Sequence, residues 1–235
     1  MASLTDDRGY NQMFAPSKAM EIRCERRCNF IISEMRITKD TNILEIGCGT
    51  GEVANLIAEK TNANVLGTDL CIPFIEEAKK KHVLPNLSFE VLNFNSPESI
   101  KGKKFDYIIG NGILHHMYYS LDEALINILF LLNVGGKMIF LEPNLINPYC
   151  YVIFTFPYFR TLAKLEPDEM AFTSTFIKKK IKSAGFSSSH VTYKDFLLPI
   201  TPDLLIKPIA AASDFTEKIP VLNKLAQSLF IVASK

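Results

Sequence analysis

The chain has 235 residues, and its 26 basic and 25 acidic side chains leave a formal net charge of +1. That balance argues against a dedicated nucleic-acid-binding protein, which would carry a strong basic excess. Hydrophobic residues make up 48% of the sequence, so the chain is not intrinsically disordered and has the apolar material for a sizeable core. We expect one domain over residues 1–235.

We expect neither a signal peptide nor a membrane-spanning helix, because no segment has the required length and apolarity. The five cysteines are an odd number and are scattered, which favours reduced thiols in a cytoplasmic protein over disulfides. Cys24 and Cys28 share one face of a helix predicted at residues 18–35. With no further thiol close by, both are interpreted as packing residues, and no metal site is expected.

Strand and helix patterns alternate through the first two thirds of the chain. The predicted elements are, in order, a strand at 42–46, a helix at 52–60, a strand at 64–67, a helix at 75–81, strands at 87–92 and 105–109, a helix at 121–132 and a strand at 137–141. Gly135 and Gly136 are expected to end the last of these helices. This alternation predicts a doubly wound α/β fold, with helices on both faces of a parallel sheet.

The pattern changes beyond Leu141, where eight of the 12 prolines and a dense aromatic run occur. The aromatic segment 145–159 is interpreted either as a buried helix between prolines or as a surface for an apolar acceptor or a peripheral membrane contact. A helix predicted at 174–184 ends at Gly185. Strands predicted at 190–196 and 228–233 complete the chain.

Three glycines at positions 47, 49 and 51 lie between the first predicted strand and its helix. Glycines in such a turn let a ligand approach the backbone closely. The spacing lacks the G-x-G-x-x-G of a pyrophosphate site, and the carboxylate of Glu45 would repel phosphate but attract an ammonium group or a donor hydroxyl. Asp69, at the end of the second strand, can accept both hydroxyls of a ribose. The set suits S-adenosylmethionine, an adenosine with a cationic tail and no phosphate.

The segment 44–51, LEIGCGTG, resembles the first motif of class I S-adenosylmethionine-dependent methyltransferases. The segments 67–69 (GTD), 105–116 (FDYIIGNGILHH) and 131–137 (LLNVGGK) resemble later motifs of this family, in the family's order. The matches together cover residues 42–142.

The resemblance implies a Rossmann-like sheet of seven strands with the last strand antiparallel, where 190–196 and 228–234 supply strands six and seven. It also implies an N-terminal helical lid over 1–40, a cofactor-binding core over 42–142, and a substrate-recognition insertion with strand six over 143–220.

The resemblance further implies that the three glycines wrap the amino-acid part of the cofactor, that Asp69 holds the ribose and that Leu70 lies against the adenine. The family commonly has an acidic residue after strand three. Here Asn93 is the expected acceptor for the adenine amino group, with Asn95 as the alternative. Tyr10 is assigned either to the lid or to packing. The expected cofactor-binding set is Glu45, Gly47, Cys48, Gly49, Gly51, Asp69, Leu70, Asn93, Phe94 and Asn111.

Candidate catalytic residues follow strands four and five, at the rim where doubly wound sheets bind ligands. His115 and His116 are adjacent. In the family that the sequence resembles, a histidine at the second place frequently lines the methyl-transfer pocket, which favours His116 over His115. Glu142 is expected either to orient a substrate or a histidine, or to cap a turn. A histidine suits base catalysis at neutral pH.

The expected reaction is transfer of the methyl group of S-adenosylmethionine, with S-adenosylhomocysteine as product, to a small-molecule acceptor. An oxygen of an apolar or lipid-like metabolite is favoured, although a neutral amine or a preformed carbon nucleophile would need no base. Two alternatives stay open at this point, a dinucleotide-dependent oxidoreductase and an inactive cofactor-binding partner protein.

Overall fold

The computed structural model describes residues 17–94, 100, 102–198 and 201–235. The Tyr10 part of the lid prediction and the alternative adenine acceptor Asn95 lie outside these residues. Within them, no helix is both long enough and apolar enough to cross a membrane.

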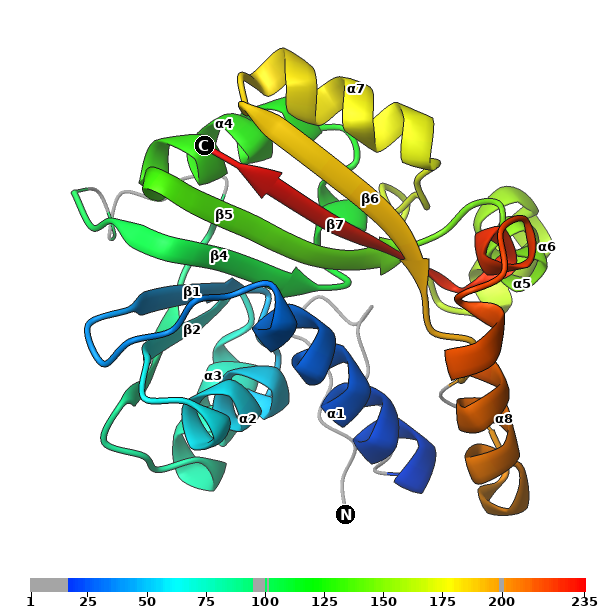
Figure 1. Cartoon of the computed structure of the whole chain (residues 1–235), viewed down its shortest axis with the longest axis horizontal. Helices are drawn as coiled ribbons and strands as arrows, with labels where there is room; N and C mark the ends of the chain where they lie inside the picture. The colour runs from blue at the N-terminus through cyan, green and yellow to red at the C-terminus, as the bar shows by residue number, and fades with distance from the viewer. Residues whose placement is uncertain (1–16, 95–99, 101, 199–200) are drawn as a thin grey trace.

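A seven-stranded sheet with strand order β3-β2-β1-β4-β5-β7-β6 forms the centre of the fold (Figure 1). The strands are β1 (Asn42–Ile46), β2 (Asn64–Asp69), β3 (Leu87–Val91), β4 (Phe105–Asn111), β5 (Leu132–Pro143), β6 (Ser188–Lys194) and β7 (Ser228–Ser234). The first five strands are parallel, and β7 runs antiparallel to both β5 and β6. The predicted Rossmann-like sheet with an antiparallel last strand is confirmed.

Helices cover both faces of the sheet, as Figure 1 shows. The helices are α1 (Lys18–Ser33), α2 (Glu52–Lys60), α3 (Ile72–Lys81), α4 (Leu121–Leu131), α5 (Pro148–Thr155), α6 (Pro157–Leu162), α7 (Ser174–Ala184) and α8 (Asp203–Thr216), with short 3-10 helices η2 (Leu114–Met117) and η3 (Leu222–Leu225). Successive strand residues point to opposite faces. Ile43 of β1 therefore packs in the core beneath α1 to α3, and its neighbour Leu44 packs in the core beneath α4 and α7.

The sequence patterns locate most of the elements, and the differences have local causes. β5 begins at Leu132, so Gly135 and Gly136 lie inside the strand rather than at a helix end. The ladder between β4 and β5 shifts register between Phe105 and Tyr107. A Cβ on Gly136 would lie 2.9 Å from the carbonyl oxygen of Asp106, so the strands can approach this closely only with glycine. The helix at Ser174–Ala184 ends as predicted at Gly185, whose φ is +99°.

Candidate active site

The glycine turn between β1 and α2 has the backbone that its sequence predicts. Gly47, Gly49 and Gly51 have φ values of +66°, +55° and +86°, in the left-handed region that favours glycine. A Cβ on Gly47 would collide with Ile113, and one on Gly51 would collide with Phe89. At Gly49 a Cβ would meet no atom within 4 Å. The turn is thus tightly packed at its two ends and accessible to a ligand in its middle.

Glu45, in β1, places a buried carboxyl group beneath this turn. Its side chain is only 2% exposed, and its Oε2 atom has no hydrogen-bond partner. Burial, together with the charges of Glu52 and Asp69, raises the pKa of Glu45 from 4.5 to about 8. An unpartnered buried oxygen is costly unless a donor satisfies it. The position therefore fits the ammonium group of an amino-acid tail.

Asp69, at the end of β2, holds the glycine turn against the start of α3. Its Oδ2 atom accepts a hydrogen bond from the Gly49 N–H, and its Oδ1 atom accepts one from the Cys71 N–H, both at 2.9 Å. Each carboxylate oxygen has a second lone pair, so the group can still accept hydroxyl donors. Leu70 follows with its side chain half exposed, whereas Cys48 is buried and donates its N–H to the Thr68 carbonyl oxygen.

The segment after β3 lies beside this acid, because the Leu92 N–H donates to the Asp69 carbonyl oxygen at 2.9 Å. Asn93 is exposed in this segment, as is required of a residue that accepts a hydrogen bond from the adenine amino group. Phe94 differs, since its side chain is buried in the core beneath α4 and α7. Phe94 can therefore contribute backbone rather than side chain to a ligand.

Asn111, at the end of β4, is held by an arginine of α1. Its Oδ1 atom accepts from Arg27 Nη1 at 2.7 Å, and the same guanidinium donates to the buried carboxylate of Asp195 and to Ser228. Arg23, one helical turn earlier, also lies 3.4 Å from that carboxylate. These contacts fix α1 to the strand ends that carry the predicted site.

Sequence reasoning missed this arginine cluster. Burial opposes ionisation of Asp195, but Arg27 and Arg23 outweigh it and hold the pKa of the carboxyl below its ordinary value. Burial lowers the pKa of Arg23 to about 9. The one available signal is the spacing of Arg23 and Arg27, which places two cations on one face of a helix with cysteines and isoleucines.

The predicted histidines lie in η2, the turn that follows β4. Glu142, buried at the end of β5, accepts hydrogen bonds from the backbone N–H groups of Ile113, Leu114 and His115. Its Oε2 atom also lies 2.8 Å from Nδ1 of His115. A carboxylate that already accepts three N–H groups acts as an acceptor here, so Nδ1 carries the proton and Nε2 is left as the basic nitrogen.

His116 faces a different pair of carboxylates, those of Glu166 and Glu169. Its Nδ1 atom lies 2.7 Å from Glu169 and 3.6 Å from Glu166. Burial alone would lower the pKa of His116, but the hydrogen bonds and charges of the two carboxylates outweigh it and raise that pKa from 6.5 to about 9. His116 is therefore a cation at neutral pH. The imidazole of His115 is instead oriented by the contact of its Nδ1 with Glu142.

Arg160 holds the loop that carries these two carboxylates. Its guanidinium donates to the backbone carbonyl oxygens of Phe154, Glu166, Pro167 and Glu169. Because the guanidinium of Arg160 donates to backbone carbonyl oxygens rather than to the two carboxylates, the side chains of Glu166 and Glu169 are directed at His116. The E-x-x-E spacing of Glu166 and Glu169 is the only sequence signal for this arrangement, which depends on contacts distant in sequence.

Potential ligand atoms of His115, His116 and Glu169 lie within 4.8 Å of one another, which is compatible with a cation site. Imidazole and carboxylate groups are common metal ligands. However, Nδ1 of His116 already lies at hydrogen-bond distance from Glu169. A protonated imidazole accounts for that contact without a metal ion.

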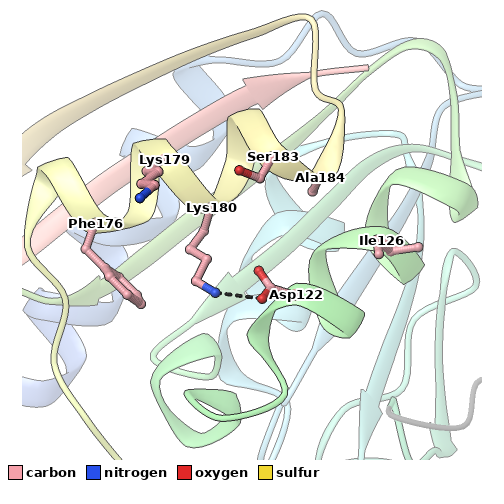
Figure 2. A pocket seen from close by; sticks show the side chains of 7 residues that line it. All are labelled: Asp122, Ile126, Phe176, Lys179, Lys180, Ser183 and Ala184. Carbon is pink, nitrogen blue, oxygen red and sulfur yellow. Dashed lines mark hydrogen bonds and ion pairs between the residues drawn. The ribbon is translucent and has the colours of Figure 1, made fainter.

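The glycine turn and η2 are neighbours, because Ile113, which directly precedes η2, packs against Gly47. A separate hollow of about 320 Å³ opens between α4 and α7, where Lys180 and Asp122 form an ion pair at 2.6 Å (Figure 2). None of the residues that line it belongs to the glycine turn, η2 or the carboxylate loop. We assign no ligand to that hollow.

Comparison with known proteins provides independent evidence on the family of this chain. Residues 37–191, more than half of the chain, match a family model described as "Methyltransferase domain". A highly reducing polyketide synthase of Pyricularia oryzae is 24% identical over 232 residues, which are 91% of this chain and 8% of that protein. A malonyl-[acyl-carrier protein] O-methyltransferase of Ilyobacter polytropus is 37% identical over 108 residues, which are 43% of this chain and 38% of that protein.

Solved structures share the fold. Phosphoethanolamine N-methyltransferase 2 of Haemonchus contortus, solved with S-adenosylhomocysteine and a phosphomonomethylethanolamine, superposes with a TM-score of 0.64 at 16% identity. The match covers 90% of this chain and 53% of that protein. The chain thus spans well under two thirds of the length of each of these relatives.

Proposed function

The chain belongs to the methyltransferase domain family, whose members use S-adenosylmethionine, and from this premise we propose that it methylates an oxygen of a small apolar or lipid-like acceptor. The observation that carries the proposal is the His115–Glu142 pair, a base with a fixed tautomer at the end of the cofactor-binding strands. An oxygen acceptor has a proton to lose, whereas a neutral amine or a carbanion needs no base.

The proposed cofactor site consists of the glycine turn and the ends of β1 to β4. Gly47, Gly49 and Gly51 accommodate the amino-acid tail, Glu45 accepts hydrogen bonds from its ammonium group, and Asp69 accepts those of the ribose. Leu70 and Asn93 flank the adenine, with backbone contributions from Cys48 and Phe94 and with Asn111 near the tail. The bound sulfonium supplies an activated methyl group.

The proposed catalytic roles follow from the hydrogen bonds in η2. Glu142 holds the imidazole of His115 so that Nε2 accepts the proton of the acceptor as the new bond forms. His116, charged at neutral pH by Glu166 and Glu169, cannot act as that base and instead contributes a positive charge beside His115. We therefore propose His115 as the base, whereas the sequence alone favoured His116.

The surrounding elements suit an apolar acceptor. The Phe154 ring lies edge-on to the imidazole of His115, with 5.8 Å between ring centroids. Residues 143–220 would then recognise the acceptor, and α1 would serve as part of the lid within a single domain. The names of two relatives refer to acyl-carrier-bound and polyketide chemistry, which also involves acyl chains. The five free thiols favour a reducing, cytoplasmic setting.

The test uses cofactor with a labelled methyl group and three acceptor classes: long-chain carboxylic acids, alkylphenols and long-chain amines. We expect label on oxygen, and a loss of about 100-fold or more in kcat for His115→Ala with unchanged affinity for S-adenosylhomocysteine. His190→Ala, which changes an exposed histidine of β6, serves as the matched control. Label only on nitrogen, or equal turnover in the His115→Ala variant, contradicts the proposal.

Family membership sets aside the dinucleotide-dependent oxidoreductase that the glycine turn alone left open. The same labelling assay addresses the inactive partner protein. Such a protein would bind S-adenosylhomocysteine tightly and transfer no label to any acceptor.

A further inference from the structure

Helix α5 packs one face against the interior beside His115 and exposes the other to solvent. Cys150 and Phe154 are buried, and Phe154 contacts the imidazole of His115. Tyr149 and Tyr151, on the same two turns of helix, have nearly half of their surface exposed. One short helix therefore connects the chemistry of the site to an apolar surface.

That surface continues over α6 and η3. Helix α6 has no buried residue, and its Tyr158 and Leu162 are 74% and 69% exposed. Figure 1 shows η3 beside α5 and α6, and the Asn147 side chain donates to the Leu225 carbonyl oxygen at 2.6 Å. We call residues 145–165 and 218–227, which carry these exposed side chains, the apolar rim.

The charges of the apolar rim are all of one sign. Its two segments contain Arg160, Lys164, Lys218 and Lys224 and no acidic residue, although the whole chain has a net charge of only +1. A second copy of the chain would bring like charges together across this surface, which disfavours self-association. Anionic lipid headgroups complement the charge instead.

We propose that the apolar rim docks on the surface of an anionic lipid bilayer and that a lipid-like acceptor enters the site from that bilayer along α5. The proposal rests on the apolar acceptor proposed above. Tyrosine and phenylalanine side chains partition into the interface between headgroups and acyl chains, and lysines bind the anionic headgroups around them. Short helices that lie on the interface suffice for such docking, without a membrane-spanning segment.

The test is flotation of the full chain with vesicles of phosphatidylcholine alone or mixed with phosphatidylglycerol. We expect binding to the mixed vesicles, with at least a tenfold weaker affinity to phosphatidylcholine alone. The double substitution Tyr158→Ser with Leu162→Ser should weaken binding at least tenfold. The matched control is Val83→Ser with Val134→Ser, which removes two valines that are 83% and 96% exposed far from the rim in sequence.

Equal binding by the rim variant and the wild-type chain overturns the proposal, as does an equal loss in the control variant. Dimerisation in sedimentation equilibrium that the rim variant abolishes, without vesicle binding, assigns the rim to a second copy and also overturns it. Turnover of a soluble short-chain acceptor separates the two proposals. If turnover occurs but vesicles do not bind, only the docking fails; if vesicles bind but no acceptor is methylated at oxygen, only the proposed acceptor fails.

Discussion

The substitution Glu45→Gln should make the ligand-free protein more stable at alkaline pH and at the same time weaken cofactor binding. Glutamine has nearly the shape of a protonated glutamate but cannot ionise. In the folded chain the pKa of Glu45 is raised from 4.5 to about 8 by burial and by Glu52 and Asp69. Folding therefore favours the protonated carboxyl, and its stabilisation is complete below about pH 4.5 and is lost as pH rises through about 8.

The magnitude follows from the size of the shift. At about 1.4 kcal/mol per pKa unit, the penalty for ionised Glu45 reaches at most about 5 kcal/mol above pH 8. Urea unfolding should give nearly equal free energies of unfolding for the wild type and Glu45→Gln near about pH 4. The variant should be more stable near about pH 9. Glu90→Gln, at a partly exposed position of β3, is the control and should follow the wild type at both pH values.

Cofactor binding should change in the opposite direction. Loss of a charge-assisted hydrogen bond of about 1.5–3 kcal/mol weakens S-adenosylhomocysteine binding by roughly 10- to 100-fold. In the wild type the ligand's ammonium group favours the charged carboxylate, so binding near about pH 7 should release a proton. Titration calorimetry in two buffers of different ionisation enthalpy measures that release. Unchanged affinity in the variant together with no proton release would refute the role given to Glu45.

Four further outcomes are expected. Asp69→Ala should lower affinity for S-adenosylhomocysteine more than tenfold in calorimetry and Asp69→Asn less, and equal affinities would remove its ribose role. Arg27→Met should lower the free energy of unfolding by about 3–5 kcal/mol in urea, because Asp195 keeps a buried charge with fewer partners; a change below about 1 kcal/mol would contradict this. The pKa of His116 is raised from 6.5 to about 9, so its ion pair stabilises the fold fully below about pH 6.5 and loses this effect as pH rises through about 9. The midpoint temperature of thermal unfolding should therefore fall more across that pH range for the wild type than for His116→Gln. Equal falls in the two proteins would be inconsistent with the ion pair. Dialysis against a metal chelator should leave turnover unchanged, and a loss that zinc or manganese restores would assign the histidines to a metal.

The sequence predicts those parts of the molecule that depend on local pattern. The strand Asn42–Ile46 and the helix Glu52–Lys60 have the predicted bounds, because apolar periodicity and a glycine turn specify both of them locally. Gly135 and Gly136 were misinterpreted, since a glycine pair after a helix is typical both of a helix end and of closely approaching strands. Only the Asp106 carbonyl oxygen of the neighbouring strand distinguishes the two.

The sequence contains more of the pattern for the proposed cofactor site than for the proposed acceptor site. The glycines, Glu45 and Asp69 fall within one continuous stretch with typical spacing. The carboxylates that charge His116 lie about fifty residues further along, on a loop whose position depends on the hydrogen bonds of Arg160. Asp195 is likewise more than 160 residues from Arg27. Such pairs leave no periodicity in the sequence, so the proposal that His115 rather than His116 is the base depends on the folded structure.

A crystal structure of the chain bound to S-adenosylhomocysteine is the decisive measurement for the proposed cofactor site. We expect the ligand's ammonium group at Oε2 of Glu45, its ribose hydroxyls at the Asp69 carboxylate and its sulfur directed toward the imidazole of His115. A nucleoside bound elsewhere, or a sulfur that points away from η2, would contradict it.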